Sequence, residues 1–247
     1  MRFVIKATAL KEFVDLQTAI VDDARWKANG EGITVRAVDP AHISMVDAQL
    51  SAAAFGTFEP GLEDIEIGID LDKALEVLNL ATGDTDISAE INEGKAILKI
   101  ANTTRRMNLV DTAEMSWPKI PNPDLPAAYS ASVSEMKKFC KGATNLADYI
   151  ILQGDSASLR LRAENDLDDL ETVLTKGDGL IDFAGPKDGG KVQSLLPLDY
   201  FSRMLSKVRA EYVAIRIGQD YPMTMEFDLA SKGKGMFMLA PRIEGPD

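Results

Sequence analysis

The feature that most constrains the fold is a cluster of prolines near the middle of this 247-residue chain. Four of the eleven prolines, Pro118, Pro121, Pro123 and Pro126, fall within residues 112–128. Proline fixes its own φ angle and has no amide hydrogen, so a stretch this rich in proline forms neither a helix nor a central strand. It predicts an extended, fairly stiff connector over residues 112–128, which joins a domain at 1–111 to a domain at 129–247.

The two halves repeat one order of elements: a strand, a helix, several strands, a second helix and further strands. The helices are expected at residues 9–21, 70–81, 134–146 and 198–208, with Thr8 capping the first and Ser134 the third. The strands are expected at residues 3–7, 33–38, 43–50, 63–69, 86–91, 96–100, 105–110, 129–133, 149–153, 158–162, 170–175, 180–183, 192–196, 212–217, 223–229 and 235–239. The pattern predicts an α+β fold of two similar sheet-and-helix domains, although the halves share little sequence.

Composition narrows the class of protein. Hydrophobic residues make up 45% of the chain, which is enough for a folded core. No run of 18 apolar residues occurs, and the N-terminus leads straight into a strand pattern, so neither a membrane span nor a cleaved signal peptide is expected. Cys140 is the single cysteine, which forbids an intrachain disulfide and suits a reducing cytoplasm. At its place on an apolar helix stripe it is interpreted as a buried, inert thiol.

The charge is strongly acidic, with 39 acidic and 27 basic residues and a net charge of −12. Nucleic-acid binding proteins usually carry a basic surface, so this balance argues against DNA binding unless the basic residues are clustered. An acidic surface also keeps a protein soluble in a salt-rich cytoplasm, where charge repulsion is screened over about 3 Å at 1 M salt. We expect both: the basic residues are clustered on an otherwise acidic protein, and the protein works in a salt-rich cytoplasm.

The chain's only histidine, His42, lies in a turn between two strand-like runs, at residues 33–38 and 43–50. Asp39 and Asp47 flank it, a pattern that fits a metal ligand pair or a carboxylate-oriented histidine. A zinc site would need carboxylates for every other ligand, because there is no second histidine and no cysteine cluster. Neither a nucleophile elbow nor a phosphate-binding glycine loop is present. A metal-assisted hydrolase centred on Asp39 and His42 and an interaction scaffold without a DNA role remain as alternatives.

Two motifs resemble the proliferating cell nuclear antigen (PCNA) family, the DNA sliding clamps of archaea and eukaryotes. The first is Asp39-Pro40-Ala41-His42-Ile43-Ser44-Met45 after a hydrophobic strand. The second is Phe237-Met238-Leu239-Ala240-Pro241-Arg242-Ile243-Glu244 at the far end. Asp220-Tyr221-Pro222-Met223 and Ala24-Arg25-Trp26 also fall where the family has similar residues. Order, spacing and length agree over the whole chain, and with the acidic composition the resemblance suggests an archaeal clamp from a haloarchaeon.

The resemblance implies the DNA clamp fold, in which two topologically similar domains of antiparallel sheets, each with two helices, assemble as a homotrimer into a six-domain ring. Such a ring encircles duplex DNA without sequence preference and tethers DNA polymerase as a processivity factor. It has no catalytic residues, metal or cofactor. The implied partners are DNA polymerase, the clamp loader, a flap nuclease and DNA ligase, which bind through short peptides.

The resemblance also assigns residues. Helix residues that would face DNA are Lys11, Lys73, Lys137, Lys138, Lys141, Arg203 and Lys207, with Arg209 just after. The groove for partner peptides would be lined by Val38, His42, Ile43, Trp117, Ile120, Pro121, Pro222, Met223, Met238, Ala240, Pro241 and Arg242. Trp117-Pro118 departs from the family's usual residues in the connector.

The seam between copies would pair the strand at 105–110 of one chain with the strand at 170–175 of the next. Its residues would be Met107, Leu109, Cys140, Ala143, Thr144, Leu146, Thr172, Val173 and Leu174. The first-half helices also carry Asp15, Asp22, Asp72 and Glu76, so tight gripping of phosphates is not expected, and the ring would hold DNA by topology.

Overall fold

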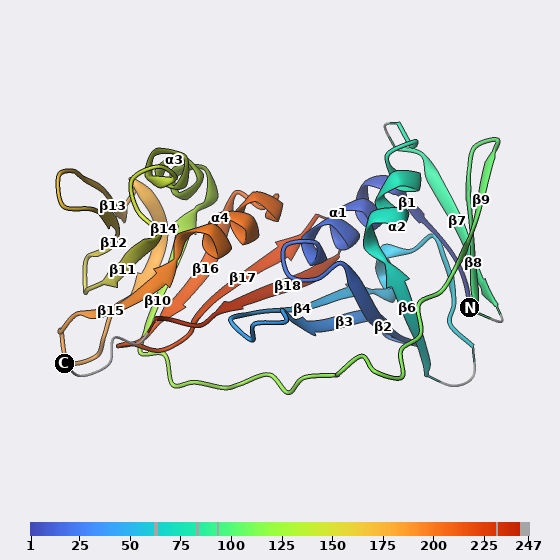
Figure 1. Cartoon of the computed structure of the whole chain (residues 1–247), viewed down its shortest axis with the longest axis horizontal. Coiled ribbons are helices and arrows are strands. Elements are labelled where there is room, and N and C mark those ends of the chain that lie inside the picture. The colour runs from blue at the N-terminus through green and yellow to red at the C-terminus, as the bar shows by residue number, and fades with distance from the viewer. Residues whose placement is uncertain (62–63, 83, 93, 231, 243–247) are drawn as a thin grey trace. The chain divides into compact units, whose positions relative to one another are not determined.

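The computed structural model (Figure 1) describes residues 1–61, 64–82, 84–92, 94–230 and 232–242. Two compact units emerge from its internal contacts. The first comprises Met1–Pro40, Met45–Lys119 and Asp228–Gly235. The second comprises Ala41–Ser44, Ile120–Phe227 and Met236–Asp247. The domain limits expected at residues 111 and 129 stay a prediction, because these clusters exchange short segments.

The first unit contains two helices and nine strands among its described residues, with a short 3-10 turn at Ala52–Ala54. Its helices are α1 (Ala7–Gln17) and α2 (Leu71–Leu78), which pack against each other. One sheet has the order β5-β1-β7-β8-β9. Four further strands follow the order β4-β3-β2-β6, and the pairings are antiparallel. The strands are β1 (Arg2–Lys6), β2 (Asp23–Asn29), β3 (Gly32–Val38), β4 (Ser44–Ser51), β5 (Thr57–Glu59), β6 (Ile65–Asp70), β7 (Asp86–Asn92), β8 (Lys95–Ile100) and β9 (Thr103–Asn108).

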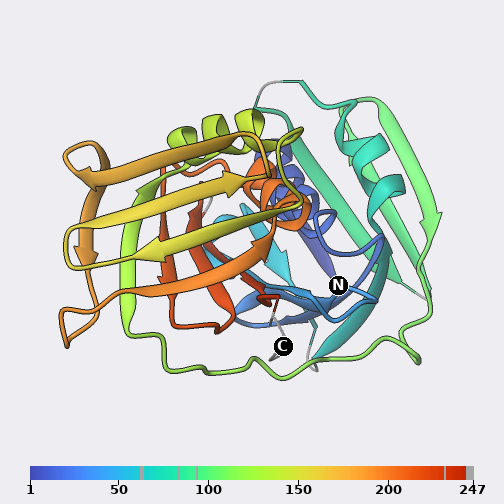
Figure 2. The ribbon, with the colours of Figure 1, turned by 60° about the vertical axis from the view of Figure 1, so that its left-hand side comes forward.

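The second unit repeats this order of elements. Its helices α3 (Val133–Ala143) and α4 (Leu198–Lys207) pack against each other. Its strands follow the order β15-β11-β12-β13-β14-β10-β16-β17-β18, and β11, β12 and β13 run side by side in Figure 2. The strands are β10 (Ala127–Ser132), β11 (Tyr149–Gly154), β12 (Ser158–Glu164), β13 (Asp169–Lys176), β14 (Gly179–Ala184), β15 (Val192–Pro197), β16 (Tyr212–Ile217), β17 (Met223–Leu229) and β18 (Gly233–Leu239).

Each unit has its own core, and in each core a buried aromatic side chain makes a hydrogen bond. In the first, Phe13 of α1 meets Trp26 of β2 edge to face at 5.4 Å, and the Trp26 indole donates to the buried Gln17 amide at 2.8 Å. In the second, the buried Tyr129 hydroxyl donates to the Asp155 carbonyl at 2.7 Å. Burial raises the pKa of Tyr129 to about 12. These polar anchors fix one arrangement of the core in each unit.

Two predicted helix caps are wrong. Thr8 lies inside α1, which begins at Ala7 after Lys6 without a side-chain cap. Strand β1 runs directly into this helix, and the Ala7 amide is satisfied by the Thr85 carbonyl at 2.8 Å. Ser132, not Ser134, caps α3 by accepting from the Glu135 amide at 3.4 Å, and the Ser134 hydroxyl bonds to that of Ser132.

Two strands were not expected from the sequence, β2 and β5. On β2 the buried positions are Ala24, Trp26 and Ala28, and two alanines give little apolar contrast. Residues 111–126 form neither helix nor strand, as their prolines predict. Among the described helices, none is long and apolar enough to cross a membrane.

Candidate functional site

The turn that contains His42 joins β3 to β4, and its residues 41–44 belong to the second unit. His42 is exposed and adopts a left-handed backbone conformation with φ 58°. The next residue, Ile43, accepts a hydrogen bond at its carbonyl from the Ala240 amide at 2.8 Å. In the part of the chain that the structure describes, no group of three or more His, Cys, Asp or Glu residues is placed to hold a metal ion. Cys140 is buried, and burial raises the pKa of its thiol.

An apolar pocket of about 620 Å³ lies in the second unit beside this turn. Four of the residues predicted for the partner groove line it: Ile43, Ala240, Pro241 and Arg242. Its other walls include Tyr149 at the start of β11, Pro197 and Leu198 at the start of α4, and Tyr200 on that helix. Concave apolar surface with a few polar groups at the rim is what an anchor side chain of a bound peptide requires.

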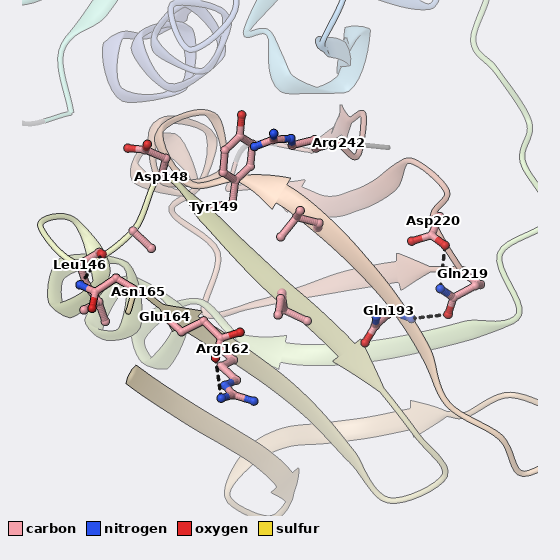
Figure 3. Close-up of a pocket in the computed structure, with 13 residues that line it drawn as sticks. Leu146, Asp148, Tyr149, Arg162, Glu164, Asn165, Gln193, Gln219, Asp220 and Arg242 are labelled. Carbon is pink, nitrogen blue, oxygen red and sulfur yellow. Dashed lines mark hydrogen bonds and ion pairs between the residues drawn. The ribbon is translucent and has the colours of Figure 1, made fainter. Parts of the chain in front are cut away.

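A second hollow of about 800 Å³ adjoins this pocket. Both cavities share Ala147, Asp148, Tyr149 and Arg242 in their walls. The Arg242 guanidinium lies 4.7 Å from the centre of the Tyr149 ring (Figure 3). The Arg242 amide donates to the Leu195 carbonyl at 2.8 Å, so the segment after β18 is held at its backbone as well.

The opposite end of this hollow is polar. Gln219 accepts from the Gln193 amide at 3.2 Å and donates to the Asp220 carboxylate at 2.8 Å, as Figure 3 shows. On a third side, the Arg162 guanidinium is paired with Glu164 at 2.5 Å. The hollow therefore offers hydrogen-bonding groups next to the apolar pocket, an arrangement that suits a peptide with both polar and apolar side chains.

The other predicted groove residues are placed as follows. Met223 and Met238 are buried in the second unit, Pro222 is half-buried, and Ile120 and Pro121 are exposed. Val38 and Trp117 belong to the first unit. The Trp117 ring there contacts two cations, Lys27 at 4.5 Å and Arg36 at 5.3 Å. These assignments stay a prediction.

Sequence reasoning missed Tyr149, Pro197, Leu198 and Tyr200 as pocket residues. They are remote in sequence from the two motifs and come together only through the pairing of β11 with β15 and the start of α4. One signal was present in the sequence. Tyr200 falls on the polar side of an amphipathic helix, with Arg203 over its ring at 4.5 Å, and a half-exposed aromatic at such a place points to binding.

The eight basic residues predicted to face DNA are all on or next to the four helices. Several are already engaged: Lys73 with Asp70 at 2.5 Å, Lys138 with Glu135 at 2.6 Å, and Arg203 with Asp199 at 3.8 Å. Lys137 donates to the Val208 carbonyl at 2.9 Å, and burial lowers the pKa of its ammonium group. Lys141 and Arg209 are exposed, while Lys11 and Lys207 are half-buried. Three of the eight are thus paired with carboxylates, which limits their pull on phosphates.

Among the strand edges that stay open within the described part of the chain are those of β9 and β13. Strand β9 ends the sheet β5-β1-β7-β8-β9, and β13 pairs with β14 only at Thr175 and Lys176. Of the residues predicted for a seam between copies, Met107, Cys140, Ala143 and Leu174 are buried inside the chain itself. Leu109, Leu146, Thr172 and Val173 are half-buried, and Thr144 is exposed. The seam stays a prediction, and its accessible part is this second group.

Comparison with known proteins gives one consistent result. Residues 2–117 match the model of the N-terminal domain of proliferating cell nuclear antigen. A DNA polymerase sliding clamp of Methanococcoides burtonii is 33% identical over 97% of both chains, and one of Natronomonas pharaonis is 29% identical over 98% of both. Among solved structures, A. fulgidus PCNA bound to the C-terminal region of FEN-1 is similar with a TM-score of 0.90 at 26% identity, over 99% of both chains. PCNA of Thermococcus kodakaraensis gives a TM-score of 0.90 at 26% identity, over 98% of this chain and 99% of that one.

Proposed function

This chain belongs to the proliferating cell nuclear antigen family of DNA polymerase sliding clamps, and from that premise we propose that three copies close head to tail into a ring around duplex DNA. A sliding clamp is a processivity factor in DNA replication and has no enzymatic activity of its own. This excludes the alternative of a metal-assisted hydrolase centred on Asp39 and His42. The ring holds DNA by enclosing it, which does not require strong phosphate contacts.

The observation that carries the ring proposal is the opposite charge of the two open edges. Strand β9 carries Arg105 and Arg106, and β13 carries Asp169 and Glu171 with Lys176 at its end. Arg105 is paired with Glu76 at 3.8 Å and Glu171 with Arg160 at 3.6 Å, which leaves Arg106 and Asp169 as the edge charges available to another copy. Pairing β9 with β9, or β13 with β13, would set like charges opposite each other, which destabilises a strand pair. Pairing β9 of one copy with β13 of the next sets opposite charges together. Such a head-to-tail contact generates a closed ring when its rotation closes.

The test of the ring is its stoichiometry. Native mass spectrometry, with light scattering at several KCl concentrations, is expected to give three chain masses. A monomer or a symmetric dimer across the whole salt range would contradict the proposal. Added duplex DNA supplies the second readout, because a closed ring slides off a linear duplex and stays on one blocked at both ends.

We propose that Lys11, Lys73, Lys137, Lys138, Lys141, Arg203, Lys207 and Arg209 face the enclosed DNA. The support is their common placement on or beside the paired helices α1–α2 and α3–α4. Ion pairs with neighbouring carboxylates leave a weak, sequence-independent attraction, which favours sliding over gripping.

We propose that partner proteins bind through short peptides at the pocket beside Ile43 and Pro241. DNA polymerase, the clamp loader, a flap nuclease and DNA ligase are the partners. The support is the apolar lining of this pocket, and the A. fulgidus relative is bound to the C-terminal region of FEN-1. A synthetic peptide with the pattern Gln-x-x-Leu-x-x-Phe-Phe is expected to bind with micromolar affinity, about −8 kcal/mol.

Calorimetry with this peptide tests the pocket. Ile43→Ala and Pro241→Ala are expected to weaken binding by roughly tenfold, since each removes apolar contact from an anchor site. Leu80→Ala is the matched control, because Leu80 is 60% exposed and belongs to the first unit, whereas the pocket lies in the second. Equal affinity in all three variants and the wild type would remove the pocket from the proposal.

We also propose that the chain works in a salt-rich archaeal cytoplasm, as expected of a haloarchaeal protein. The support is the net charge of −12. Repulsion among surface carboxylates is screened at molar salt, so the free energy of unfolding is expected to rise between 0.1 and about 2 M KCl. A free energy of unfolding that is highest in dilute buffer would argue for a cytoplasm of ordinary salt concentration.

A further inference from the structure

The chain leaving β9 is fastened to the first unit at successive points before the prolines of the connector begin. The first point is Val110, whose amide donates to the Gly68 carbonyl of β6 at 2.9 Å. The approach is close enough that a Cβ at Gly68 would lie 2.1 Å from the Val110 carbonyl oxygen. The second point is the Met115 carbonyl, which accepts from the Arg25 guanidinium of β2 at 2.8 Å. These contacts anchor residues 110–115 to two adjacent strands.

The third point is Trp117. Its ring contacts the ammonium of Lys27 from β2 at 4.5 Å and the guanidinium of Arg36 from β3 at 5.3 Å. Arg36 also donates to the Pro118 carbonyl at 3.3 Å. We call Trp117, Lys27 and Arg36 the tryptophan clip. Each cation–π contact of this kind contributes about 0.5–1 kcal/mol where water is near, and more where it is excluded.

The two cations of the clip are themselves held in place by carboxylates on the flanking strands. Arg36 pairs with Asp47, directly opposite on β4, at 2.7 Å. Lys27 pairs with Glu66, directly opposite on β6, at 3.2 Å. Glu66 also accepts from Arg25, and that hydrogen bond lowers the pKa of the Glu66 carboxyl. A cation that is already held by a carboxylate loses less side-chain entropy when it contacts the Trp117 ring. This sheet face is therefore preorganised for that contact.

The connector beyond the clip differs sharply. Within the described part of the chain, residues 119–124 take part in no hydrogen bond or ion pair. Regular contacts resume at Leu125 and Pro126, which lie against Gly218, and at Ala127 in β10. The connector therefore has a fastened first part and an unbonded middle. The middle contains Ile120 and Pro121, which are exposed.

We propose that the tryptophan clip is a positioning device for partner binding: it fixes where the unbonded middle of the connector starts, and Trp117 itself does not contact the partner peptide. This proposal rests on the peptide-binding function proposed above. A fixed start lowers the number of conformations that residues 119–124 sample, and so lowers the entropy lost when a peptide orders them. This assigns Trp117 a role different from the groove wall expected from the sequence.

The test uses the full chain and two readouts. Amide hydrogen exchange and tryptic cleavage after Lys119 report on the connector, and calorimetry with the Gln-x-x-Leu-x-x-Phe-Phe peptide reports on binding. Trp117→Ala is expected to speed exchange of the Met115 amide, which donates to the Thr112 carbonyl at 3.1 Å, and cleavage after Lys119 at least fivefold, and to weaken peptide binding three- to tenfold. Ser116→Ala, at the exposed neighbouring position, is the matched control and should change neither readout.

Lys27→Met separates positioning from direct contact. Lys27 lies on β2, where its ammonium group pairs with Glu66 and faces the Trp117 ring. Lys27→Met therefore lowers the affinity for the peptide, as Trp117→Ala does, only if the clip acts through the connector. The double variant Trp117→Ala/Lys27→Met should lose no more affinity than Trp117→Ala alone, since both changes open the same clip. Trp117→Phe, which keeps an aromatic face, should restore most of the affinity.

Three results would overturn the proposal. One is a Lys27→Met protein that binds the peptide as tightly as the wild type while Trp117→Ala does not, which would make Trp117 a direct contact. Another is loosening of the connector in Trp117→Ala without loss of affinity. The third is unchanged exchange and cleavage in Trp117→Ala. If the wild type binds no peptide at all, the peptide-binding function fails, and exchange and cleavage still show whether the clip fastens the connector.

Discussion

The two units share one order of elements but place their charges in opposite ways. One open edge of the first unit, that of β9, is basic through Arg105 and Arg106, whereas the edge of β13 in the second unit is acidic through Asp169 and Glu171. The helices reverse this. Helices α1 and α2 mix Lys11 and Lys73 with Asp15, Asp72 and Glu76, whereas on α3 and α4 the basic residues Lys137, Lys138, Lys141, Arg203 and Lys207 outnumber Glu135 and Asp199. The two units thus keep one architecture while their surface charges differ. The edges become complementary, and one pair of helices becomes the more basic.

The largest expected effect comes from reversing one edge. Arg106→Glu places a carboxylate on β9, where it would face the acidic β13 of the next copy, and the trimer is expected to dissociate. Glu171→Lys in the same chain restores opposite charges, so the double variant should regain three chain masses in native mass spectrometry. Lys99→Glu on β8 makes the same charge change one strand further in, and should leave the trimer intact.

A second variant compares close packing in the two units. Gly68→Ala would drive a methyl group into the Val110 carbonyl, and Gly154→Ala would drive one into the Tyr129 ring, 2.6 Å from its Cε2. Overpacking of this kind costs about 1–3 kcal/mol of unfolding free energy. Urea unfolding should therefore show both variants destabilised, whereas Gly30→Ala, with no atom within 4 Å of the new methyl group, should be near neutral.

The two glycine variants should nevertheless differ in where they act. Val110 is the first point at which the chain leaving β9 is fastened, so Gly68→Ala should also speed hydrogen exchange at residues 109–118. Gly154→Ala should leave those amides unchanged, because Tyr129 and Gly154 belong to the other unit. Equal exchange in both variants would show that Gly68 does not control the start of the connector.

The regular elements of this fold could be predicted from the sequence because each long strand and helix has a clear period. Strand β17, Met223–Leu229, and strand β16, Tyr212–Ile217, were expected with the bounds that the structure gives. Strand β2 could not be found, because its buried face is Ala24, Trp26 and Ala28. The cap of α3 was missed by two residues because Ser132 and Ser134 offer the same chemistry, and that of α1 was wrong because this helix has no side-chain cap.

The candidate site could be predicted only in part. Ile43, Ala240, Pro241 and Arg242 belong to two motifs, and the structure places them around one pocket. Tyr149, Pro197 and Tyr200 carry no motif, and only strand register brings them there. The tryptophan clip was beyond sequence reasoning for the same reason, since Lys27, Arg36 and Trp117 are separated by up to 90 residues and meet through the pairing of β2 with β3.

The contrast between the helix pairs gives a smaller effect. Lys138→Glu with Lys141→Glu on α3 is expected to lower polymerase processivity roughly three- to tenfold, about 1 kcal/mol, by weakening attraction to phosphates. Lys11→Glu with Lys73→Glu on α1 and α2 should have less effect, because acidic residues outnumber basic ones on these helices and the reverse holds on α3 and α4. Primer extension on a blocked circular template measures both. Equal losses would mean that the two helix pairs contribute alike.

The smallest expected effect is the acid response of the carboxylate behind the tryptophan clip. The hydrogen bond from Arg25, and after it that from Lys27, lowers the pKa of Glu66 below its usual value of 4.5. A carboxyl whose pKa is lower in the folded state stabilises the fold above the unfolded value, and that contribution is lost as the pH falls through the lowered folded pKa. Because Glu66 is largely open to solvent, the change in unfolding free energy should be small.

Urea titrations from pH 6 to pH 3 should show the wild type losing its advantage in unfolding free energy over Glu66→Gln below about pH 4.5. Glu226→Gln removes an Arg216-paired carboxylate from the second unit and is the control for loss of an exposed ion pair. Lower protection of the Met115 amide, relative to its intrinsic exchange rate at each pH, would tie Glu66 to the clip, whereas protection that does not depend on Glu66 would show that Arg36 and Asp47 hold Trp117 without it.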